Sequence, residues 1–138
     1  MEYEISCEWK GGMAFDAEVN GHHIMLDAKK EVGGEDKGPR PKPLVLTALA
    51  GCTGMDVASL LKKMRVKVDN LKIDVKGQMT EEHPKYYDKI HVTYTVSGKD
   101  VDKKKFEKAV NLSQERYCGV SEMVRQFADL TYEVVYEG

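Results

Sequence analysis

The sequence of 138 residues predicts one α+β domain spanning residues 1–138. Short stretches of alternating apolar and polar residues predict six strands. One long apolar segment, residues 43–61, predicts a central helix, and a second helical region lies between the fifth and sixth strands. The expected order is βββ-α-ββ-αα-β, with antiparallel sheets around a long buried central helix. Because strands and helices are segregated along the chain, α+β is favoured over a doubly wound parallel sheet.

The first three strands form an expected antiparallel meander. The first is expected to be half-buried, because its apolar residues alternate with polar ones. The apolar positions are Tyr3, Ile5, Cys7 and Trp9. Gly11 and Gly12 follow as a turn, and residues 15–20 form the second strand. Asn20 and Gly21 both tolerate positive φ, which predicts a hairpin turn into a third strand at about residues 22–27.

Residues 29–43 contain glycines and three prolines and predict a loop. The segment that follows carries one charge, Asp56, between Pro43 and Leu61. A helix that is apolar on nearly every side is expected to be buried on most sides, which one small sheet cannot provide. Gly51 and Gly54 each cost such a helix about 1 kcal/mol relative to alanine. We therefore expect a partner helix or a ligand to approach closely there, and a dimer would supply the missing cover.

The second half of the chain predicts strands at about residues 71–75 and 90–96. Asp102 is expected to cap a helix whose buried stripe contains Phe106, Ala109, Val110 and Tyr117. Cys118 and Gly119 end that helix. Ser121 is expected to cap a short helix to about Phe127, and alternation over residues 132–136 predicts the last strand.

Composition excludes several classes of function. The formal net charge is −2, with 32% charged residues, so we expect no nucleic acid and no membrane as partner. The polar residues within segment 43–61 argue against a membrane span. Residues 1–10 lack a signal-peptide pattern. Three cysteines are an odd number, which disfavours a secreted disulfide framework and favours a cytoplasmic protein.

The three cysteines have different settings. Cys7 lies on the apolar face of a strand and is expected to be a small buried hydrophobe. Cys52 lies within the apolar helix. Cys118 lies at a helix break after Arg116, and both a helix start and a nearby arginine favour the thiolate. The separation of 118 − 52 = 66 residues does not by itself pair them. No CxxC pair or histidine spacing predicts a metal site.

Two segments carry a resemblance to a known family. LTALAGCTGMD at residues 46–56, preceded by GPRPKP, and LSQERYCGVS at residues 112–121 resemble the two cysteine motifs of the OsmC/Ohr family (osmotically inducible protein C and organic hydroperoxide resistance protein). CTGMD with EVGG ahead of it resembles the YhfA-like branch. The order of elements also fits, so the resemblance covers nearly the whole chain.

The resemblance implies an OsmC-like fold, an intertwined homodimer with shared active sites, and a thiol peroxidase acting on small hydrophobic peroxides in oxidative stress defence. Cys52 would be the peroxidatic cysteine and Cys118 the resolving one. We expect no cofactor, and we expect an external dithiol to act as the reductant. No metal is implied.

Two positions depart from the family pattern. The early turn that carries an arginine in family members contains Gly11, Gly12 and Met13, and Lys42 replaces a glutamate ten residues before the first cysteine. Arg40 is then the candidate stabiliser of the thiolate and the peroxide. Asp56, one turn after Cys52, would oppose ionisation if it faces the same way. These departures leave an alternative open: a non-peroxidase OsmC-fold protein that binds a hydrophobic small molecule or senses redox state.

Overall fold

The structure, a computed structural model, describes all 138 residues. The chain divides into two compact units, residues 1–45 and 46–138, and each is described by itself. The predicted order of strands and long helices is confirmed. That residues 1–138 form one domain stays a prediction.

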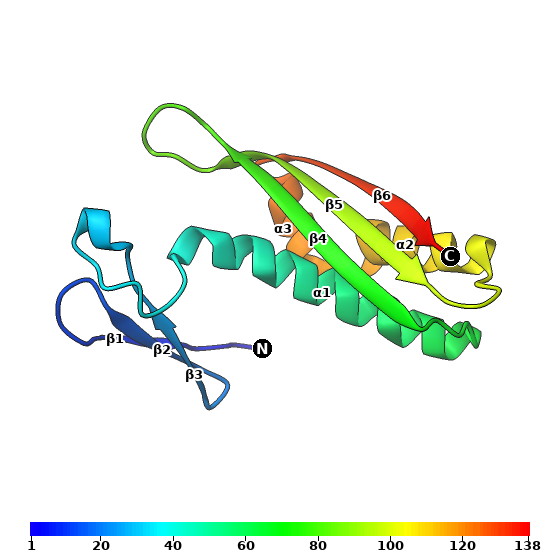
Figure 1. The fold of residues 1–138 in the computed structure, drawn as a ribbon, viewed down its shortest axis with the longest axis horizontal. Helices are drawn as coiled ribbons and strands as arrows, with labels where there is room; N and C mark the ends of the chain where they lie inside the picture. Colours follow the sequence, from blue (N-terminus) through cyan, green and yellow to red (C-terminus); the bar gives the residue numbers. More distant parts are fainter. The chain divides into compact units, whose positions relative to one another are not determined.

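The first unit is a three-stranded antiparallel meander in the order β1-β2-β3 (Figure 1). Its strands are β1 (Ser6–Trp9), β2 (Phe15–Val19) and β3 (His22–Leu26), followed by the short 3-10 helix η1 (Lys30–Val32). Both predicted turns are confirmed. Gly11 and Gly12 have φ of 95° and 55°, and Asn20 and Gly21 have φ of 51° and 78°.

The prediction of a buried Cys7 is wrong for the single chain, because every residue of β1 is exposed. The alternation of β1 is present, but its own unit contributes no element that covers the strand. The one helical element before the long helix is the three-residue η1, which has no buried residue. An alternating pattern predicts a strand with one apolar face, and it does not determine what covers that face.

A buried carboxyl group organises the loop after β3. Asp27 is 3% exposed and accepts hydrogen bonds from the backbone N–H groups of Ala28 (2.7 Å), Glu35 (3.1 Å) and Lys37 (3.2 Å). Burial alone would raise the pKa of Asp27, but the three donors outweigh it, and the pKa lies below its usual value. The loop is therefore wrapped around a carboxylate.

The long helix α1 (Pro41–Met64) begins two residues earlier than expected. Its buried residues are Leu49, Thr53, Val57 and Leu61, which recur every four positions and form one stripe. The prediction of burial on most sides is wrong for the single chain, since Met55 is 77% exposed and Val45 41% exposed. By length and composition alone the segment Pro43–Met64 could cross a membrane, a weak criterion that core helices of soluble proteins also meet.

The second unit contains a sheet in the order β4-β5-β6 with α1, α2 and α3 behind it in the view of Figure 1. The strands are β4 (Asn70–Met79), β5 (Tyr87–Ser97) and β6 (Asp129–Glu137). β4 and β5 pair antiparallel, but β5 and β6 pair parallel, which corrects the expectation of purely antiparallel sheets. The two helices between β5 and β6 carry the chain back to the other end of the sheet, as a parallel pair requires.

The helices between β5 and β6 match the prediction at the first cap and differ from it further along the chain. Asp102 caps α2 (Lys103–Leu112) by accepting from the Lys105 N–H at 3.1 Å, as expected. Tyr117 is 53% exposed, because the helix widens into a π-helical turn over Ser113–Tyr117 and its register rotates. The cap of α3 (Gly119–Arg125) is Cys118 rather than Ser121, which lies inside the helix.

Candidate active site

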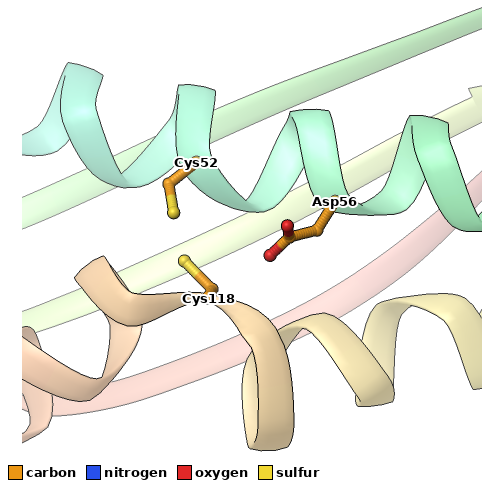
Figure 2. Close-up of side chains that lie close together, drawn as sticks. All are labelled: Cys52, Asp56 and Cys118. Carbon is orange, nitrogen blue, oxygen red and sulfur yellow. The ribbon is translucent and has the colours of Figure 1, made fainter.

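Three side chains from distant parts of the sequence converge between α1 and the start of α3. Figure 2 shows the sulfurs of Cys52 and Cys118 pointing toward each other, with the carboxylate of Asp56 beside them. One ligand atom from each residue lies within 4.8 Å of the other two. Cys52 and Asp56 are four residues apart on α1 and therefore share a face of that helix. The fold thus brings together two cysteines that are 66 residues apart.

Cys118 is held by its backbone and its sulfur. Its N–H donates to the carbonyl of Ser113 at 2.7 Å, which closes the π-helical turn. Its sulfur accepts the N–H of Ser121 at 3.3 Å and so caps α3. Cys118 is 3% exposed, whereas Cys52 is only partly buried. π-Helical turns are found frequently at functional sites.

The surroundings of Cys52 favour the thiol over the thiolate. Burial is the largest factor that raises the pKa of Cys52, followed by its hydrogen bond to Cys118 and the negative charge of Asp56. A hydrogen bond from the backbone N–H of Val120 acts in the opposite direction but does not prevail. The expectation that Asp56 faces Cys52 and opposes its ionisation is confirmed.

A chain of buried hydrogen bonds ends at the carboxylate of Asp56. The hydroxyl of Ser113 donates to Asp56 Oδ2 at 3.1 Å, so it accepts from Thr53 Oγ1 at 2.7 Å. Since each hydroxyl has one proton, Thr53 in turn accepts from the Tyr94 hydroxyl at 2.6 Å. The Gln114 side-chain amide donates to Tyr94 at 2.6 Å. Every proton in this chain therefore points toward the carboxylate of Asp56.

Arg40, the candidate thiolate stabiliser, belongs to the first unit. Its guanidinium forms an ion pair with Asp36, and its Nη1 is buried without a hydrogen-bond partner. Arg40 also lines an apolar cavity of about 660 Å³ within that unit. The cavity's apolar lining includes Cys7, Met13, Phe15, Leu26, Val32 and Pro41. A role for Arg40 beside Cys52 stays a prediction.

Sequence reasoning did not identify four residues of the site: Thr53, Tyr94, Ser113 and Gln114. Each is at most 1% exposed, whereas serine, threonine and glutamine are usually on the surface. One signal was present in the sequence for Thr53, which follows Cys52 and lies four residues from both Leu49 and Val57 on α1. A polar residue on the buried stripe of a helix needs a buried partner.

The fold and the site define an α+β protein with two cysteine thiols close enough to react with each other. Residues 34–133 match the family model of the OsmC-like protein, and the chain belongs to this family. Protein YhfA of Escherichia coli strain K12 is 34% identical over 131 residues, which are 93% of this chain and 95% of YhfA.

Two further comparisons agree with this assignment. The organic hydroperoxide resistance protein OhrB of Bacillus subtilis is 30% identical over 114 residues, 80% of this chain and 78% of OhrB. A crystal structure of a hypothetical protein from Aquifex aeolicus VF5 superimposes with a TM-score of 0.82 and 34% identity. That alignment covers 100% of this chain and 99% of the Aquifex chain. The YhfA-like branch of the OsmC/Ohr family, expected from the two cysteine motifs, is therefore confirmed.

Proposed function

We propose that this protein is a thiol-dependent peroxidase that reduces organic hydroperoxides through Cys52 and Cys118. The observation that carries the proposal is the convergence of the two thiols, which lie within 4.8 Å of each other although 66 residues separate them. The similarity to OhrB, whose name describes organic hydroperoxide resistance, supports the same chemistry. A peroxide-related redox role is common to this family and its Ohr relatives.

The reaction has three balanced steps. The Cys52 thiolate attacks the terminal oxygen of ROOH, the O–O bond breaks, and the alkoxide takes up a proton to leave as an alcohol. The sulfenic acid formed on Cys52 then reacts with the Cys118 thiol, which gives a disulfide and releases water. An external dithiol reduces this disulfide by thiol–disulfide exchange and is itself oxidised.

Exposure supports the assignment of the two roles. Cys52 is partly exposed, so a peroxide can reach its sulfur, whereas Cys118 is buried against Ser121. A buried thiol beside an exposed one suits the resolving role, because it meets the sulfenic acid without competing for the substrate. Because the pKa of Cys52 is raised, a smaller fraction of it is thiolate at neutral pH than for an ordinary cysteine.

We also propose that two chains assemble into a homodimer with shared active sites, in the cytoplasm. The exposed apolar side of α1 supports the dimer. Met55 is 77% exposed, and a side chain added at Gly51 meets no atom within 4 Å in the single chain. An exposed apolar surface of this kind marks a site of contact with another protein chain, which removes it from water. Arg40 remains the proposed cation for the thiolate or peroxide in that assembly.

The proposal is tested by turnover with an organic hydroperoxide and a dithiol reductant. Cys52→Ser should abolish turnover. Without the dithiol, Cys118→Ser should reduce one equivalent of peroxide and keep the sulfenic acid on Cys52, because the chain has no partner thiol there to form the disulfide. Cys7→Ser is the matched control and should keep full activity, since Cys7 is an exposed cysteine of the first unit. Undiminished turnover by the Cys52 variant would end the proposal.

A second candidate function is the binding of a hydrophobic small molecule. The specific observation in its favour is the apolar cavity of about 660 Å³ in the first unit, together with the raised pKa of Cys52. In this case a lipophilic molecule would co-purify with the protein, and replacing Cys52 or Cys118 would leave its occupancy unchanged. Phe15→Asp, which places a charge in the cavity lining, would remove it.

A further inference from the structure

We propose that Cys52, Asp56 and Cys118 also form a binding site for a divalent cation that accepts both sulfur and oxygen, with Zn²⁺ as the matching ion. Two thiolates and a carboxylate are ligands that Zn²⁺ binds. Ca²⁺ and Mg²⁺ do not fit this set, since they require oxygen ligands and higher coordination numbers. This inference stands independently of the proposed peroxidase activity.

The geometry is close to that of a tetrahedral site. Each of the three ligand atoms lies within 4.8 Å of the other two. Zn–S bonds of about 2.3 Å and a Zn–O bond of about 2.0 Å place tetrahedral ligand atoms about 3.5–3.8 Å apart. The three ligand atoms therefore need to approach one another by at most about 1.0–1.3 Å, which side-chain rotation can supply.

The charge of Asp56 lacks a counterion. The carboxylate is partly buried and forms no ion pair with any lysine, arginine or histidine. The Asp56 carboxylate is also the final acceptor of the hydrogen-bond chain, which reaches it through the Ser113 hydroxyl. A cation bound beside this partly buried carboxylate would supply the opposite charge that no basic side chain supplies. This chain of donors is an observation separate from the ligand geometry, and it points to the same occupant.

The three ligands are positioned before any ion arrives. Cys52 and Asp56 lie one turn apart on α1, so a single helix face presents both. The Cys118 sulfur accepts the Ser121 N–H, and a hydrogen bond from Ser113 orients the Asp56 carboxylate as an outer-sphere partner. Three protein ligands leave the fourth position of a tetrahedral ion to water or a small ligand.

Binding of the ion has a chemical consequence for the thiols. Each thiol that becomes a ligand loses its proton, so one Zn²⁺ displaces two protons and no electrons are transferred. Both sulfurs are then occupied, and neither is available to form the disulfide. Metal binding and the Cys52–Cys118 disulfide are therefore mutually exclusive states of the same site.

The test is a Co²⁺ titration of the reduced, full-length protein, followed by displacement with Zn²⁺. Thiolate ligands give Co²⁺ a near-ultraviolet charge-transfer band, and tetrahedral coordination gives intense visible bands. We expect both sets of bands at one ion per chain and their loss on adding Zn²⁺. Cys52→Ser and Cys118→Ser should each weaken the charge-transfer band, and the oxidised protein should give none.

Asp56→Asn isolates the carboxylate ligand, because it keeps the shape of the side chain and both thiols. We expect this variant to bind Co²⁺ at least about 10- to 100-fold more weakly, because losing only an outer-sphere partner of a ligand already has an effect of this size. Cys7→Ser should titrate like the unchanged protein, and circular dichroism shows whether each variant is folded. Absent bands in the reduced protein, or a folded Asp56→Asn variant with unchanged affinity, would overturn the three-ligand site. The turnover assay of metal-free protein reports on the peroxidase proposal separately.

Discussion

Replacing Tyr94 by phenylalanine should destabilise the protein by breaking the hydrogen-bond chain beneath the cysteines. Tyr94 is fully buried, and its hydroxyl joins Gln114 to Thr53 through two bonds of 2.6 Å. The variant keeps the ring and removes one oxygen. Thr53 retains Ser113, but the Gln114 amide loses its acceptor, and its Oε1 already has no partner. A buried donor left unpaired costs about 1–3 kcal/mol, so we expect a loss of about 2 kcal/mol.

The measurement is the free energy of unfolding of the reduced protein from urea titration. Tyr132→Phe is the matched control, because it removes a tyrosine hydroxyl from the neighbouring strand β6. That hydroxyl donates to Asn111 at 2.9 Å in an exposed position. We expect the control to change stability by less than about 0.5 kcal/mol. Equal effects of the two substitutions would show that the buried chain contributes nothing beyond an exposed bond.

Three further predictions concern the site and its surroundings. The rate of alkylation of Cys52 should continue to rise at pH values where the rate for an ordinary cysteine has levelled off, because its raised pKa keeps it protonated. Asp56→Asn should lower the pKa of Cys52 and so speed its alkylation at neutral pH. A slower rate in this variant would contradict the role given to Asp56. Formation of the Cys52–Cys118 disulfide should raise the free energy of unfolding by about 4 kcal/mol, from closing a loop of 66 residues, and urea titration of oxidised and reduced protein checks this. Gly77→Ala should cost about 1–3 kcal/mol in the same assay, because its new Cβ would lie 2.7 Å from the ring of a neighbouring tyrosine.

Local signals in the sequence predicted much of the fold. The Asn20–Gly21 turn and the Asp102 cap depend on neighbouring residues only, and both are confirmed. The parallel pairing of β6 with β5 was missed, since strand alternation does not encode the direction of a partner. Tyr117 was misplaced because the expected helical spacing assumed that the helix stays regular through residue 117.

The candidate site was predictable only in part. Its two cysteines were identified through motif resemblance, because a separation of 66 residues gives no information about distance in space. Asp56 was foreseeable from helical geometry, since residues four apart share a face. The partners Tyr94 and Ser113 were not, because their burial depends on how α1, β5 and the π-helical turn pack together.

The most direct test of the account treats the reduced protein with one equivalent of an organic hydroperoxide, then counts thiols and measures the intact mass and the linked peptides. We expect rapid loss of two thiols, a mass lower by two hydrogen atoms, a Cys52–Cys118 link, and an unmodified Cys7. No reaction, or slow oxidation distributed over all three cysteines, would contradict a redox pair and favour the binding function.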